Sequence, residues 1–134
     1  MPRAAHLMTN WNDNTKARAE MTALPVLDLV YLSRQTLGDV ALELELLSTF
    51  DRQAGLIMAR LDAASDMAQG SKADLVHTLK GSARAVGALA LAFVADIHEG
   101  VLRAGVGGEV ESELKAMLGE AVVAVRADIK RLLA

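Results

Sequence analysis

The sequence contains no cysteine and few aromatic residues. The lack of cysteine excludes disulfides and thiolate metal sites, which agrees with a reducing compartment. Aromatic residues make up 3% of the chain and hydrophobic residues 52%, so any core must be mainly aliphatic. A length of 134 residues suits one domain.

The sequence also lacks an excess of basic residues and any long apolar run. A formal net charge of −3 argues against a general nucleic-acid binder, which usually has a basic surface. No apolar run approaches the roughly 20 residues that a bilayer span requires. The N-terminal segment lacks the apolar centre of a signal peptide. We therefore expect a soluble cytoplasmic protein without nucleic-acid or membrane partners.

Apolar residues recur at spacings of three and four, and no stretch alternates with period two, so the sequence predicts an all-α fold. Pro25 suits the first turn of a short helix that Gly38 ends. Asp39 is a natural N-cap for a longer helix. Ser71 and Asp74 form a capping-box-like start for the next one.

Glycines mark the remaining boundaries. Gly87 can adopt the left-handed conformation that closes a helix, and residues 105–108 separate the last two helices. Four amphipathic helices with short connections favour an antiparallel four-helix bundle over residues 23–134, with the Pro25 helix as a cap. A dimeric coiled coil is the alternative, but the glycines cut the pattern, so we expect a monomer. Residues 1–22 lack sustained periodicity and predict a flexible N-terminal tail. The apolar stripe expected on the helix after Asp39 comprises Val40, Leu44, Leu47, Phe50, Ala54, Ile57 and Leu61.

The candidate site lies in residues 71–88, SKADLVHTLKGSARAVGA, with His77 near the centre. At about 100° per residue, His77 points away from the apolar side of this helix and faces water. Lys80, Gly81 and Arg84 share its outer face, with Ala73 one turn before. The inward side comprises Leu75, Leu79, Ser82, Ala83 and Val86.

These neighbours suit an anion bound to the histidine. A glycine inside a helix costs about 1 kcal/mol relative to alanine, so Gly81 suggests that another molecule needs room beside His77. Lys80 and Arg84 place positive charge where phosphate oxygens would sit. A neutral imidazole can act as a nucleophile. The pattern therefore predicts a phosphate acceptor.

The string His77-Thr78-Leu79-Lys80-Gly81-Ser82-Ala83, followed by Val86-Gly87-Ala88, resembles the signature of histidine-containing phosphotransfer domains in two-component phosphorelays. Leu37-Gly38-Asp39 before an apolar helix, and Glu99 with Arg103 and Gly105, extend the resemblance to about residues 24–133. The histidine at position 98 departs from it, because the family more often has an apolar residue before the glutamate.

The resemblance implies a phosphocarrier that is not itself a kinase. His77 would be the phosphoacceptor, surrounded by Lys80, Gly81 and Arg84. The implied partners are response-regulator receiver domains and a hybrid sensor histidine kinase. Mg²⁺ would be carried by the receiver, so we expect no cofactor or metal of the chain's own.

Two other function classes are open. The first is a helical adaptor that binds receivers without phosphotransfer. The second is the phosphoacceptor part of a sensor kinase, but Thr78 stands where an acidic residue is common, and no glycine-rich phosphate loop is present.

The remaining candidate residues receive structural interpretations. We expect His98 to be a flanking or partly buried histidine, because its spacing to His77, Asp96 and Glu99 is not a recognised metal-ligand pattern. Ser82 is interpreted as a packing residue that bonds back to its own helix. His6 and Trp11 receive no role.

Overall fold

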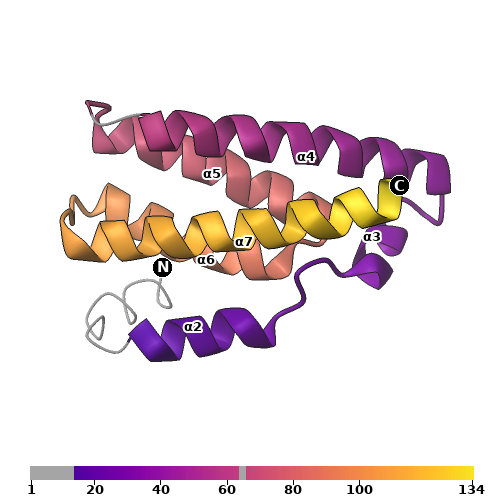
Figure 1. The fold of residues 1–134 in the computed structure, drawn as a ribbon, viewed down its shortest axis with the longest axis horizontal. Coiled ribbons are helices and arrows are strands. Elements are labelled where there is room, and N and C mark those ends of the chain that lie inside the picture. The colour runs from indigo at the N-terminus through magenta and orange to yellow at the C-terminus, as the bar shows by residue number, and fades with distance from the viewer. Residues whose placement is uncertain (1–13, 64–65) are drawn as a thin grey trace.

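The computed structural model of the protein describes residues 14–63 and 66–134 and is all-α within them, which confirms the predicted class (Figure 1). No helix in these ranges is long and apolar enough to cross a bilayer. The helices are α2 (Asn14–Ala23), α3 (Leu29–Gln35), α4 (Val40–Ala63), α5 (Gln69–Val86), α6 (Leu89–Arg103) and α7 (Glu109–Leu133).

The four long helices α4 to α7 lie lengthwise beside one another (Figure 1). Contacts join α4 to α5, α5 to α6, α6 to α7, and α7 back to α4. Helix α6 also contacts α2, and every residue from Ala90 to Glu99 is buried. Because α6 is enclosed by several neighbours, a polar side chain on it carries a desolvation cost unless it finds a partner inside the protein.

The core is mostly aliphatic, as the composition predicts, with Phe50 and Phe93 as its aromatic members. The predicted stripe of α4 is buried from Leu47 to Leu61. The prediction is wrong for the first two residues of the stripe, because Val40 is 63% exposed and Leu44 is 42% exposed. Figure 1 shows the reason: the start of α4 extends past the end of α5.

Residues 14–22 correct the prediction of a flexible tail, because they form most of α2. Ala17 is buried against the core, and Met21 packs at its edge one turn later. Arg18 Nη1 lies 2.8 Å from Glu120 Oε2 of α7. Two apolar residues at helical spacing gave too weak a sequence signal for this helix. The remainder of the predicted tail, with His6 and Trp11, lies outside the described residues.

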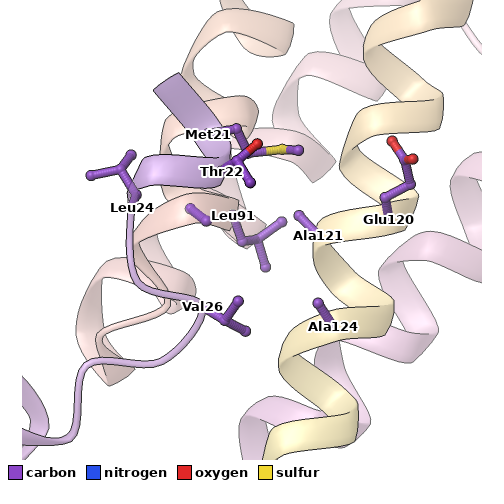
Figure 2. A pocket seen from close by; sticks show the side chains of 9 residues that line it. Met21, Thr22, Leu24, Val26, Leu91, Glu120, Ala121 and Ala124 are labelled. Carbon is purple, nitrogen blue, oxygen red and sulfur yellow. The ribbon is translucent and has the colours of Figure 1, made fainter. Parts of the chain in front are cut away.

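An apolar cavity of about 180 Å³ lies where the end of α2 meets α6 and α7 (Figure 2). Leu91 and Ala121 are on its inner side, and Glu120 is on its wall. Its full lining is Met21, Thr22, Leu24, Val26, Ala90, Leu91, Glu120, Ala121 and Ala124.

The predicted start of the first short helix is wrong. Helix α3 begins at Leu29, because Asp28 Oδ1 accepts a hydrogen bond from the Tyr31 amide at 3.0 Å and caps the helix. Pro25 lies before α3, where its carbonyl accepts from the Ala90 amide at 3.0 Å. The capping role of Asp39 is confirmed, since its Oδ1 accepts from the Leu42 amide at 3.0 Å.

Helix α5 begins earlier than predicted and ends as predicted. Its N-cap is Ala68, so Ser71 lies within the helix and His77 is near its middle rather than in its second turn. Gly87 closes the helix in the left-handed conformation at φ 84°. A Cβ on Gly87 would lie 2.7 Å from the Asp28 carbonyl oxygen, so this close approach requires glycine.

Candidate functional site

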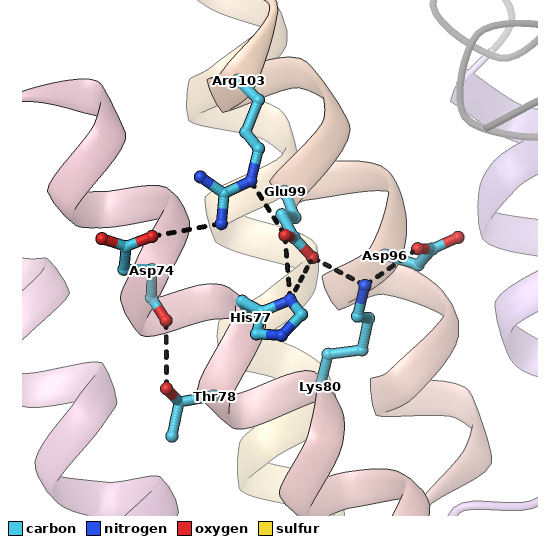
Figure 3. Close-up of polar contacts among 7 residues, drawn as sticks. All are labelled: Asp74, His77, Thr78, Lys80, Asp96, Glu99 and Arg103. Carbon is cyan, nitrogen blue, oxygen red and sulfur yellow. Dashed lines mark hydrogen bonds and ion pairs between the residues drawn. The ribbon is translucent and has the colours of Figure 1, made fainter.

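His77 projects outward from the middle of α5, as its sequence position predicts. Its side chain is 61% exposed, whereas Val76 and Leu79 beside it are fully buried. These buried neighbours hold the helix against the core, so the His77 side chain points into solvent in a fixed orientation. This side chain is the exposed end of a polar group that we call the His77 network: His77, Asp74, Lys80, Asp96, Glu99 and Arg103 (Figure 3).

Glu99 of α6 is the centre of the His77 network. Its carboxylate oxygens lie 3.0 and 3.2 Å from His77 Nδ1, so both face the same ring nitrogen. Lys80 Nζ is 2.6 Å from Oε1, and Arg103 Nε is 3.0 Å from Oε2. Figure 3 shows the three donors converging on this one carboxylate.

The charge of Glu99 is held by these donors. Burial by itself would raise the pKa of the carboxyl, but hydrogen bonds from Lys80, Arg103 and His77 outweigh it and lower the pKa to about 2. Glu99 is therefore ionised at neutral pH. An ionised carboxylate only accepts hydrogen bonds, so the proton of neutral His77 belongs on Nδ1 and the lone pair on Nε2.

Lys80 does not lie where the sequence pattern placed it. It is 8% exposed, and its Nζ pairs with Glu99 at 2.6 Å and with Asp96 at 3.4 Å. The position on α5 faces α6, so the long side chain runs between the two helices rather than out beside the imidazole. Its charge is already balanced by two carboxylates.

Arg103 and Asp74 join the two helices on the other side of His77. Arg103 Nη2 lies 3.1 Å from Asp74 Oδ1, while its Nε bonds to Glu99. Asp74 is on α5, one turn before His77, and its side chain is 76% exposed. The pair links α5 to α6 near the imidazole, and the same guanidinium also bonds to Glu99.

The space predicted beside His77 is present. Gly81 is exposed, and a Cβ built on it would have no neighbour within 4 Å. Arg84 is exposed, as predicted, and borders a surface groove that Leu89 and Phe93 also line. Ala73 is a correction: it is fully buried and does not contribute to the outer face.

Ser82 also differs from its predicted interaction. Its hydroxyl donates to Gln53 Oε1 of α4 at 2.9 Å, instead of bonding back to α5. The bond connects two helices of the core, so Ser82 has a packing role, as expected, but across a helix interface.

His98 is more deeply buried than predicted. It is 2% exposed, and neither ring nitrogen has a hydrogen-bond partner among the described residues. Burial lowers the pKa of His98 to about 4, so it is neutral at pH 7. It borders a polar cavity of about 240 Å³ together with Leu61, Asp62, Lys72, Glu111, Ser112 and Lys115.

The carboxylates near His77 and His98 are paired with a cation. Glu99 and Asp96, the carboxylates that would complete a metal site with the two histidines, are engaged with Lys80. Across residues 14–63 and 66–134, no cluster of three histidine or carboxylate side chains has a geometry suited to a metal ion.

Sequence reasoning missed the central role of Glu99 and the contributions of Asp74 and Asp96. The i,i+4 spacing of Glu99 and Arg103 indicates a pair on one helix. No spacing within the sequence indicates that this pair meets His77, because that contact depends on how α5 packs on α6.

Comparison of the chain with protein-family models, curated proteins and solved structures found no match. The geometry of the His77 network is therefore the basis for the function proposed below.

Proposed function

We propose that this protein is a histidine phosphotransfer protein, in which His77 accepts a phosphoryl group from a receiver-domain aspartyl phosphate and passes it to another receiver. The observation that carries the proposal is the exposed imidazole whose Nδ1 faces the buried Glu99 carboxylate at 3.0 Å. This arrangement leaves Nε2 as a nucleophile directed to solvent.

The transfer follows from that tautomer. The Nε2 lone pair attacks phosphorus in line, the N–P bond forms, and the bond from phosphorus to the aspartyl oxygen breaks. The aspartate leaves as a carboxylate, and the proton stays on Nδ1, where the ring becomes positively charged. Glu99 accepts the hydrogen bond from Nδ1–H and stabilises that charge as it develops. Return of the phosphoryl group to a second aspartate reverses these steps.

We propose that helices α4 to α7 form an antiparallel four-helix bundle, with α3 as a short cap. The ring of contacts through α4, α5, α6 and α7 supports this arrangement. Short connections, such as the one between Val86 and Leu89, also favour antiparallel neighbours. A rigid bundle would present the imidazole in one orientation to each partner.

The proposed partners are receiver domains of response regulators and of a hybrid sensor kinase. The receiver would supply Mg²⁺ and the acidic pocket, and this chain would supply the nucleophile. We propose a cytoplasmic monomer that binds transiently, because a carrier must release each partner. Micromolar affinity corresponds to about −8 kcal/mol.

Incubation with a receiver domain phosphorylated on its aspartate tests the proposal. We expect a label on the chain that is acid-labile and base-stable, and that disappears in His77→Gln. His6→Gln is the matched control and should keep the label. Binding of the receiver without any label would favour the adaptor function instead.

A further inference from the structure

We propose that Lys80 is a positioning residue that acts through Glu99, and that Arg84 is the cation that meets the phosphoryl group. This inference rests on the proposed phosphotransfer function and divides the roles of two cations that the sequence pattern places on one face.

The position of Lys80 supports the first half of the inference. Its side chain is 10% exposed, and its shortest contact is the 2.6 Å pair with Glu99 Oε1. Asp96, at 3.4 Å, holds the same ammonium from a second direction. Any movement of Lys80 toward an oxygen bound at His77 Nε2 that broke these two pairs would leave both carboxylates buried without its charge.

The position of Lys80 also has a consequence for the imidazole. Both oxygens of Glu99 face His77 Nδ1, and Lys80 and Arg103 each bind one of them. The two cations thus fix the orientation of the carboxylate and keep it ionised. A fixed, ionised acceptor selects the Nδ1–H tautomer, so Lys80 determines which ring nitrogen is free to react.

The surface beside His77 supports the second half. Gly81 and Arg84 follow His77 by four and seven residues on α5, so all three lie along one helix face. Gly81 leaves open space between them, because a Cβ there would meet nothing within 4 Å. Arg84 is exposed and lies three residues beyond Gly81 on the same helix. A phosphoryl group on Nε2 can therefore lie over Gly81 and receive a charge-assisted bond from the guanidinium.

A double-mutant cycle separates the roles. We expect Lys80→Gln and Glu99→Gln each to slow transfer from a phosphorylated receiver by about tenfold. The double variant should be no more than about twofold slower than the slower single variant, because both changes remove one positioning device. Arg84→Gln should slow transfer by about tenfold in the wild-type background and by the same factor in the Glu99→Gln background.

A spectroscopic measurement accompanies the rates. The ¹⁵N NMR signals of the His77 ring should report the Nδ1–H tautomer in the wild type and in Arg84→Gln, but a tautomer mixture in Lys80→Gln. Lys80→Arg keeps the cation and should keep the tautomer. Lys72→Gln is the matched control, since Lys72 is also on α5 but pairs with Glu111 at 3.3 Å, and it should leave rate and tautomer unchanged.

Two results would overturn the inference. They are multiplicative effects of Lys80→Gln and Glu99→Gln, or an unchanged His77 tautomer in Lys80→Gln. Either one, in a wild-type protein that becomes labelled, would show that Lys80 does not act through Glu99 and would leave the proposed function intact. Absence of label in the wild type would instead refute the proposed function itself.

Discussion

The two described histidines lie in different environments, and helix α6 contributes to both. His98 is on α6, and His77 contacts the next residue of α6, Glu99. His77 is exposed, and its Nδ1 is bonded to Glu99 of α6. His98, the residue before Glu99, is buried, and within the described part of the chain both of its ring nitrogens lack a partner. Adjacent positions of α6 thus hold a fully bonded carboxylate and an unbonded imidazole. The difference indicates that polar interactions on α6 are concentrated on the side that faces His77.

Replacing Glu99 by leucine should produce the largest change in stability. The substitution leaves Lys80 buried with Asp96 as its remaining carboxylate, at 3.4 Å, and breaking a buried ion pair costs about 3 kcal/mol. Urea denaturation measures the loss in the free energy of unfolding. Ala127→Leu, at an exposed position on α7, is a control for adding an apolar side chain. A Glu99→Leu protein as stable as the wild type would show that the network contributes no stability.

The pH dependence of stability should distinguish His98 from Glu99, because the two side chains change protonation in different pH ranges. The pKa of His98 is about 4 in the folded protein and near 6.5 when unfolded, so the unfolded state binds more protons between these values. Stability should therefore fall as the pH is lowered from about 6.5 to about 4, by about 3 kcal/mol at most. Glu111 opposes this shift in pKa, whereas Lys72 and Lys115 reinforce it.

Glu99 acts in a lower pH range. Its folded pKa of about 2 lies below the usual 4.5, so its contribution is complete above 4.5 and is lost as the pH falls toward 2. Denaturation curves at several pH values measure both ranges. His98→Leu should flatten the curve between pH 4 and 6.5 and leave the lower range unchanged. A wild-type curve that is already flat above pH 4.5 would contradict the burial of an unbonded imidazole.

At pH 7.5, where His98 is neutral in both states, His98→Leu should stabilise the protein by about 1 to 2 kcal/mol. The reason is that an unbonded buried polar group carries a desolvation penalty that leucine does not. Replacement by leucine should thus raise the free energy of unfolding at position 98 and lower it at the neighbouring position 99. A loss of stability in His98→Leu would show that the imidazole has a partner in the adjoining cavity. Thermal unfolding with His98→Gln as a polar control measures the effect.

The sequence predicted features that depend on local chemistry and failed where packing decides. Helical spacing was sufficient for the all-α fold, for the exposure of His77 and for the space at Gly81. The burial of Lys80 could not be predicted, because on a single helix a lysine beside an exposed histidine looks equally exposed. Its carboxylate partners are on α6, and their approach is a property of the helix pair.

The same reason explains the errors at the N-terminus. Helix α2 has a weak apolar pattern of its own and is held by contacts such as Arg18 with Glu120, which are far apart in the sequence. The start of α3 was misplaced because Pro25 can begin a helix, but in this fold its carbonyl is needed by the Ala90 amide. Local signals list the possible boundaries, and tertiary hydrogen bonds select among them.

The smallest expected effect concerns the open space beside His77. Gly81→Ala should raise the free energy of unfolding by about 1 kcal/mol, because alanine favours the helix and its Cβ meets no atom within 4 Å. Gly87→Ala is the contrasting control and should destabilise the protein, since Gly87 has φ 84° and a Cβ there would lie 2.7 Å from the Asp28 carbonyl oxygen.

A large side chain at position 81 tests whether phosphotransfer needs the open space beside His77. Gly81→Trp should leave the protein folded, because the side chain extends into solvent, but it should strongly slow phosphotransfer by filling the space over which the phosphoryl group and its donor approach His77. Circular dichroism and the transfer assay measure the two effects on the same sample. Undiminished transfer in Gly81→Trp would mean that partners approach the imidazole from another side. Arg84 would then lose its proposed contact with the phosphoryl group, while the hold of Glu99 on Nδ1 would be unaffected.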